Sequence, residues 1–215
     1  MIEPSPQKSS EPQRSTPAKQ LSEDAIVLED LASVIRIPNL FRRVRCVLDR
    51  AFAVYHLPED SPFALTSTTP GNGETDLGYR WMDGQGLIQL FLGMAWGKEG
   101  HDPIWEVRVE ANSTDLATHL RAGHWHRLAA RRADSRFSEW DRFWQEDDPS
   151  ATLLFGASAA VTRFFEEEDP ERMAADYLAA ALYSLHASGA VTAILEVARE
   201  AVGGGHFGNV APGHG

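Results

Sequence analysis

The sequence has a single cysteine, three lysines and no hydrophobic run long enough to cross a bilayer. Because Cys46 is alone, no disulfide can form within the chain. The longest apolar run, 87–96, is far shorter than the ~20 residues of a transmembrane helix. Residues 1–20 are polar and proline-rich, without an apolar signal core. We therefore expect a cytoplasmic protein with no membrane segment.

The charge is strongly one-sided, with 31 acidic against 20 basic residues and a formal net charge of −11. This balance argues against a protein that coats nucleic acid over its whole surface. Nearly all the cations are arginine, which binds carboxylates and phosphates through two hydrogen bonds. Codon usage rich in G and C explains the arginine equally well. A hydrophobic content of 43% suits one globular domain with a substantial core.

The stretch 77–111 predicts the centre of the fold, an antiparallel β-meander. Apolar and polar residues alternate along 77–82, as in a strand with one buried face. A turn over 83–86 leads to 87–96, which is apolar on both faces and therefore predicts a strand inside the sheet. A third strand is expected over 104–111, with its charged face towards water.

Helices and shorter strands are expected around this meander. The spacing of apolar residues predicts a helix from Ser22 to Ile35, whose apolar positions include Leu28 and Leu31, and another from Asn39 to Tyr55. Further predicted helices cover 113–122, 136–145, 156–164 and 170–202, the last broken near Ser188–Gly189. Further predicted strands cover 62–68, with Phe63 and Leu65 facing inward, 124–129 and 151–155.

These elements predict a single α+β domain over 22–202. Its central antiparallel β-meander is covered by helices mainly on one face, and its C-terminal region is helical. Residues 1–21 and the glycine-rich 203–215 have too little apolar content to fold, so both are expected to be disordered tails.

The element order over 39–130 resembles the core of the PD-(D/E)XK nucleases. In that family an acid after one strand and Glu-x-Lys on the next hold Mg²⁺ with two carboxylates. The nearest match is Asp83 followed by Glu106-Val107-Arg108. Arginine replaces the lysine and cannot act as a neutral base, and Asp83 precedes Gly84 in a turn where aspartate is common for backbone reasons. The resemblance implies a metal-dependent nuclease-like enzyme using Asp83 and Glu106.

The same order and the acidic composition also resemble type III secretion chaperones. Those are small α/β proteins that dimerise and hold an unfolded segment of a partner. The resemblance covers topology and charge alone, and a shared fold does not fix a function. It implies a non-enzymatic protein that binds another protein.

Two further patterns suggest chemistry. On the predicted strand 124–129, His124 and His126 share a face and, with His119 nearby, could chelate Zn²⁺. No acid or cysteine stands at a motif-like distance, and surface or hydrogen-bonded histidines are the commoner case. The run 156–160 has the outline of a nucleophile elbow around Ser158, but the parallel strands of that fold are missing upstream.

An arginine-rich segment and two tryptophans are the candidate binding residues: Arg121, Arg127, Arg131, Arg132, Trp96 and Trp105. The arginines could bind an acidic partner or nucleic acid, or pair with the acidic runs 146–148 and 166–168. The tryptophans flank the loop 97–103, so we expect both to be partly exposed.

No group of residues assembles a convincing catalytic motif, and no catalytic residue, metal or cofactor is assigned. We expect a non-enzymatic interaction or regulatory protein of the bacterial cytosol, adaptor-like or chaperone-like. The alternative is the nuclease-like enzyme. The expected partner is a protein or a second copy of the chain, with nucleic acid as a second candidate for the arginine segment.

Overall fold

A six-stranded antiparallel sheet forms the centre of the part of the chain that can be described. The computed structural model describes residues 42–67, 76–95, 103–135, 137, 140, 142–143 and 152–204. The sheet has the order β1-β2-β3-β4-β6-β5. Its strands are β1 Phe63–Ser67, β2 Asp76–Asp83, β3 Ile88–Ala95, β4 Ile104–Ala111, β5 Arg142–Phe143 and β6 Leu153–Ala160.

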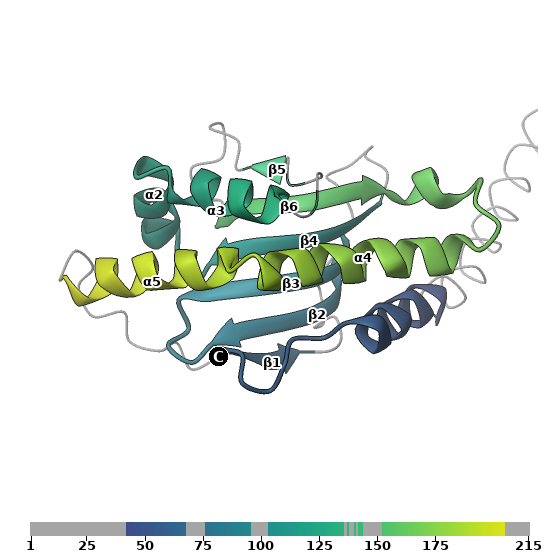
Figure 1. Ribbon diagram of the computed structural model, residues 1–215, viewed down its shortest axis with the longest axis horizontal. Coiled ribbons are helices and arrows are strands. Elements are labelled where there is room, and N and C mark those ends of the chain that lie inside the picture. Colours follow the sequence, from purple (N-terminus) through teal and green to yellow (C-terminus); the bar gives the residue numbers. More distant parts are fainter. Residues whose placement is uncertain are drawn as a thin grey trace, which may run out of the picture. The chain divides into compact units, whose positions relative to one another are not determined.

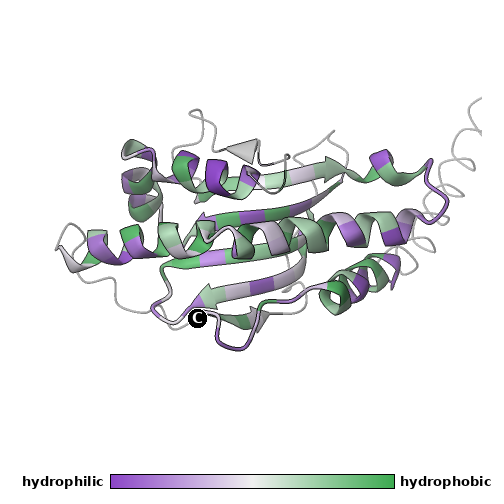
Figure 2. Ribbon diagram, in the orientation of Figure 1, coloured by the Kyte–Doolittle hydropathy of each residue, from purple (hydrophilic) through white to green (hydrophobic). Residues whose placement is uncertain are grey.

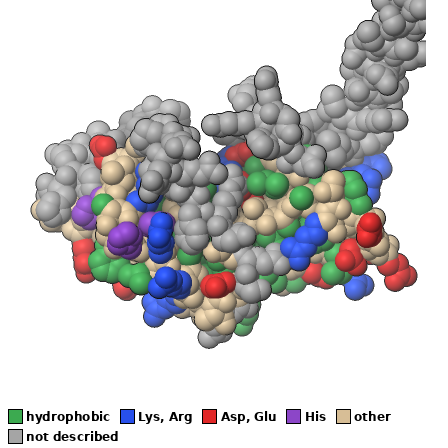
Figure 3. All heavy atoms as spheres, turned by 90° about the horizontal axis from the view of Figure 1, so that it is seen from above, with side chains coloured by type: hydrophobic (Ala, Val, Ile, Leu, Met, Phe, Trp, Pro, Cys, Tyr) green, Lys and Arg blue, Asp and Glu red, His purple; other side chains and the backbone are tan. Residues whose placement is uncertain are grey.

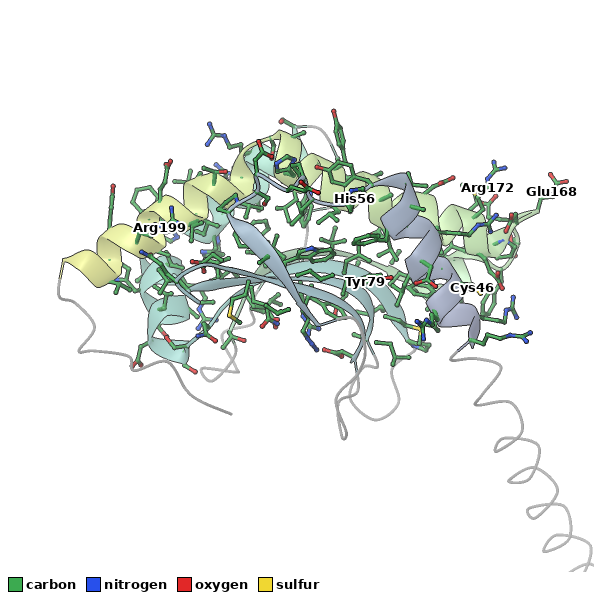
Figure 4. All side chains as sticks on the ribbon, turned by 90° about the horizontal axis from the view of Figure 1, so that it is seen from below. Cys46, His56, Tyr79, Glu168, Arg172 and Arg199 are labelled. Carbon is green, nitrogen blue, oxygen red and sulfur yellow. The ribbon has the colours of Figure 1, made fainter. Side chains whose placement is uncertain are left out.

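The helices lie mainly on one side of this sheet, with α4 and α5 running across it (Figures 1 and 4). They are a helix over 42–54, α2 Thr114–Ala122, α3 Trp125–Asp134, α4 Pro170–Ala187, α5 Ala190–Gly203 and the 3-10 turn η1 Val161–Phe164. The structure confirms the predicted α+β fold, with a central antiparallel meander, a helical cover and a helical C-terminal region.

The core fills the space between the sheet and the helices. Cross-strand neighbours Trp81, Leu90 and Val109 point into it from β2, β3 and β4, and all three are buried. Leu178 of α4 and Ile194 of α5 close it from the other side. Figure 2 shows hydrophobic and hydrophilic residues alternating along α4 and α5. Burial of these apolar faces, at roughly 25 cal/mol per Å², is the main force holding the helices to the sheet.

Local signals place the helix ends. Ser113 caps α2 by accepting a hydrogen bond from the Leu116 amide at 3.3 Å. Asp169 caps α4 through the Arg172 amide at 3.0 Å, and Pro170 follows at the first helical position. Gly189 has a φ of 72°, a backbone conformation that favours glycine, and there the chain bends by 53° between α4 and α5.

Several predicted elements are wrong. Residues 125–134 form a helix rather than the strand predicted over 124–129. Gly156 lies inside β6 rather than at the start of a helix. Leu65 is exposed, although it was expected to face inward with Phe63. A left-handed Gly123 was expected to end the helix predicted over 113–122, but Gly123 has a φ of −78° and the left-handed residue is the next one, His124.

Other predictions fall partly or wholly on ranges that the structure does not describe. Of the helix predicted over 136–145, the described pair Arg142–Phe143 is a strand instead. The predicted N-terminal tail, the helix over 22–35 and Trp96 lie outside the described residues. So does the predicted C-terminal tail from residue 205 onward.

Within the described ranges, no single helix is long and apolar enough to cross a membrane. α4 and α5 meet that composition only when they are taken together. Their most apolar side chains, including Leu182 and Leu195, belong to the core described above.

Candidate binding surface

A groove opens between α3 and α5 on the outside of the helical layer. Its volume is about 460 Å³, within the roughly 300–1,000 Å³ of ligand-sized clefts. It is lined by Trp125, Leu128, Ala129, Arg132, Ala193, Ile194, Glu196 and Val197. Trp125 and Leu128 are 40% and 52% exposed, which is unusual for side chains of this size. We call this feature the α3–α5 groove.

Three exposed arginines stand along the same helix that forms one wall of the groove. They are Arg127, Arg131 and Arg132, and within the described part of the chain none of them makes an ion pair. Figure 3 shows histidine side chains gathered at the left of the view, with basic, acidic and hydrophobic side chains beside them. The surface therefore combines apolar area with positive charge, although the chain as a whole is acidic.

The back of α3 is fixed firmly to the core. Ala129, Ala130 and Ala133 are buried, and the Ser184 hydroxyl of α4 donates a hydrogen bond to the Ala133 carbonyl at 2.8 Å. His126 is also buried, and its burial lowers its pKa to about 4, so the ring is neutral at pH 7. The outward side chains of α3 are thus held on a rigid support.

The other candidate binding residues lie elsewhere. Arg121 is buried, with its guanidinium 3.4 Å from the Leu153 carbonyl, so it joins α2 to β6 rather than facing solvent. Trp105 is 4% exposed and belongs to the core, so the expectation that it is partly exposed is wrong. Of the six candidate residues, the structure brings Arg127, Arg131 and Arg132 together on one helix.

A buried charge network occupies the other face of the sheet, which none of the described helices covers. Arg108 of β4 is its centre: Nη1 lies 2.5 Å from Glu106, Nε lies 3.2 Å from Glu110, and Nη2 bonds Asp76 of β2. Arg80 lies 3.6 Å from the same Asp76 carboxylate. These side chains are at most 17% exposed, so the charged face of β4 does not meet water as predicted.

The Phe91 ring lies at the middle of this network. The guanidinium carbons of Arg108 and Arg80 are 4.3 and 5.0 Å from its centroid, close enough for cation–π attraction on both sides. The ring rests against the glycine pair Gly78 and Gly93, where any side chain would overlap both Phe91 and the neighbouring backbone. The Phe91 ring at the centre of the network can therefore lie over positions 78 and 93 only because both are glycine.

The structure does not bring Asp83 and Glu106 together. Asp83 follows the alternation of Trp81 and faces the helices, whereas Glu106 lies on the opposite face. Glu106 is level with Gly78, five residues along β2 from Asp83, or about 17 Å at the usual strand rise.

Asp83 instead organises the β2–β3 turn. Its carboxylate accepts hydrogen bonds from the backbone amides of Gln85, Leu87 and Ile88 at 2.6–2.8 Å. This is the backbone role that the turn sequence itself suggested.

The predicted zinc pair and nucleophile elbow also change with the fold. His124 and His126 lie at a helix start, where one ring is exposed and the other is buried, so they do not share a face. No group of three or more histidine, cysteine, aspartate or glutamate side chains in the described ranges could hold a metal ion. Ser158 sits inside β6 opposite Glu106, not on a strand-to-helix turn.

Sequence reasoning missed both the groove and the buried network. One signal for the network was present: β3 is apolar on both faces, so the polar face of its neighbour β4 had to be covered as well. The groove gave no such signal, because it depends on the helical state of 125–134 and on its position beside α5.

No known family model matches the chain, and no curated protein or solved structure is significantly similar to it. The residues described above are therefore the sole basis for a function.

Proposed function

We propose that this chain is a non-enzymatic protein-interaction protein of the bacterial cytosol, adaptor-like or chaperone-like, that holds an acidic amphipathic helix of a protein partner in the α3–α5 groove. The observation that carries the proposal is the coexistence of an open apolar groove and three exposed arginines without ion pairs on one rigid helix. A single, exposed cysteine fits a reducing compartment.

The apolar lining argues for a helix as the bound element. Helices bind grooves by inserting apolar residues at positions i, i+3 or i+4 and i+7 between two helices of the receptor. Trp125 and Leu128 on α3 and Val197 on α5 provide the walls for such anchors. Aromatic residues at the centre of an interface commonly contribute most of the binding energy.

The charges argue for an acidic partner. α3 presents Arg127, Arg131 and Arg132 against one exposed acid of its own, Asp134. A carboxylate-bearing helix would gain charge-assisted hydrogen bonds to these arginines. Arg132 lines the groove and the exposed Arg131 precedes it on α3, so these two charges should chiefly accelerate association and be sensitive to salt.

The test uses a synthetic 14-residue helical peptide with leucines on one face and glutamates on the other. We expect the charge reversal Arg131→Glu with Arg132→Glu to weaken its binding at least tenfold at low salt and less at high salt. Leu128→Asp should weaken it similarly at both salt concentrations. Arg42→Glu, an exposed arginine on another helix, is the matched control and should leave the affinity within about twofold.

Three results would contradict the proposal. The first is no binding of the acidic peptide by the wild-type protein. The second is equal binding of a peptide in which lysines replace the glutamates. The third is binding of a single-stranded oligonucleotide, lost in the arginine variant, without binding of the acidic peptide, which would indicate a nucleic-acid surface instead.

A further inference from the structure

We infer that the α3–α5 groove receives residues 22–35 of a second copy of this chain, so that the protein associates with itself through exchanged N-terminal segments. This inference rests on the proposed function, because it uses the same groove and the same arginines. It adds a specific occupant, which would compete with any external partner.

The chemistry of residues 22–35 matches what the groove requires. The segment reads SEDAIVLEDLASVI and contains four acidic residues and no basic residue. Its sequence predicts a helix with Leu28, Leu31 and Ile35 at positions i, i+3 and i+7 of one face. These are the spacing and the charge expected of a helix bound between α3 and α5.

The groove offers the complementary surface. Trp125 and Leu128 give an exposed apolar wall, Arg132 lines the groove one helical turn further along α3, and the exposed Arg131 precedes it. Three of the four described arginines of the 42–54 helix are less suited to the segment, because Arg43, Arg45 and Arg50 already pair with carboxylates of this same chain.

The length of the connecting chain favours a second copy over the same chain. Arg43 is paired with Glu171 at the start of α4, whereas the groove lies on α5, beyond the other end of α4. Figure 4 shows Arg172 and Arg199 near opposite ends of the α4–α5 pair.

α4 alone has 18 residues and is about 27 Å long. The seven residue steps from Ile35 to Arg42 span at most about 25 Å when fully extended. A segment of the same molecule would therefore reach the groove only with its linker stretched. A segment from another molecule meets no such limit.

Disulfide trapping between full-length chains tests the occupant directly. In a Cys46→Ser background, one protein carries Leu31→Cys and a second, separately tagged protein carries Leu128→Cys. We expect the mixed proteins to form a tagged heterodimer at least tenfold faster than Leu31→Cys mixed with Val54→Cys, an exposed control position on the 42–54 helix. Adding Arg131→Glu and Arg132→Glu to the Leu128→Cys protein should remove this difference.

Equal rates for the two mixtures would overturn the inference. So would a Leu31→Cys, Leu128→Cys double variant that cross-links only within one chain, since the occupant would then be the molecule's own segment.

A second measurement separates failure of the inference from failure of the proposed function. Leu28→Asp with Leu31→Asp, made in the full chain, should abolish self-association in sedimentation velocity and raise the affinity for the acidic peptide several-fold. Peptide binding that is unchanged by this variant, in a protein that stays monomeric, overturns the inference and leaves the proposed function standing. Absence of peptide binding in both proteins overturns both.

Discussion

The 42–54 helix and α3 carry similar numbers of arginines but use them in opposite ways. On the 42–54 helix, Arg43 lies 2.7 Å from Glu171 and Arg50 lies 3.4 Å from Asp169, so two arginines connect that helix to the start of α4. On α3, within the described ranges, the exposed arginines make no ion pair and stand beside an open groove. One set of charges holds the fold together, and the other makes no ion pair within the described ranges.

Arg108 is the most buried and most fully paired of the arginines in this comparison. Its side chain is 12% exposed and meets three carboxylates, so its charge is neutralised inside the protein. The three sites teach that an arginine's role follows from its burial and its carboxylate neighbours, since the side chain is the same in each. The first and the last of the predictions below test the two ends of this comparison, and the others test the sheet centre, the β2–β3 turn and the buried side of α3.

The largest effect is expected at Arg108. Arg108→Met leaves Asp76, Glu106 and Glu110 as buried or half-buried carboxylates without their central cation, which should destabilise the fold by about 3–5 kcal/mol. Arg131→Met on α3 is the control and should change stability by less than about 0.5 kcal/mol. Urea unfolding measures both. If both variants changed the free energy of unfolding by the same small amount, the charge network would contribute no more to stability than an exposed arginine.

A comparably large loss of stability is expected on the face of the sheet that meets the helices. Leu90 and Leu92 of β3 are essentially unexposed, so Leu90→Ala and Leu92→Ala should each cost about 2–5 kcal/mol. The stability losses of these two variants can then be compared with the loss caused by Arg108→Met in the charge network. Unfolding midpoints that do not move for either variant would mean that this face is not the core.

A smaller loss is expected at the β2–β3 turn. Asp83→Asn replaces one carboxylate oxygen by an amide nitrogen that cannot accept the bonds from the turn amides, at a cost of about 1–3 kcal/mol. Asp134→Asn, on the exposed side of α3, is the matched control and should be close to neutral. An unchanged thermal midpoint for Asp83→Asn would contradict the turn role of this carboxylate.

The buried histidine of α3, His126, should make the stability of the protein depend on pH. Burial lowers the pKa of His126 from 6.5 to about 4, so between these values the unfolded chain binds a proton that the folded chain does not. Stability should therefore fall as the pH drops from 6.5 towards 4, by about 1–2 kcal/mol after allowance for partial hydration of the ring. His126→Gln should flatten this slope; an identical slope in the variant would count against a buried, neutral ring.

The smallest effect is expected for the surface pairs of the 42–54 helix. A double-mutant cycle with Arg43→Gln and Glu171→Gln should give a coupling of about 0.2–1 kcal/mol that weakens with salt. The same cycle for Arg131 and Glu171, which are not paired, should give a coupling indistinguishable from zero. Equal couplings would remove the distinction between the two helices.

The sequence allowed prediction of the meander because its pattern there is unambiguous. Alternation over 77–82 and 104–111, with a doubly apolar strand between them, fits one arrangement of three strands. The turn at Asp83 and the helix break at Gly189 were also predictable, since each uses a residue suited to a special backbone conformation.

The candidate surface was only partly predictable, for physical reasons that particular residues show. α3 buries mainly alanines and exposes Trp125 and Leu128, which reverses the usual pattern from which a helix is recognised. Gly156 was interpreted as the start of a helix, but its lack of a side chain allows close contact with Val107 and Arg108 of the neighbouring strand. Arg127, Arg131 and Arg132 were found from charge alone, whereas the groove beside them requires α5, some 60 residues later in the chain.

The glycine pair beneath Phe91 has a consequence for recognising relatives of this chain. Gly78 and Gly93 face each other across β2 and β3, and neither tolerates a side chain, while Phe91 covers both and separates Arg80 from Arg108. Together they define a spaced signature, Gly-x-Arg, then Phe-x-Gly, then Glu-x-Arg, on three successive strands. A distant relative that has lost all other likeness should keep these residues together or lose them together, because the ring, the glycines and the two guanidinium groups fit only as a set.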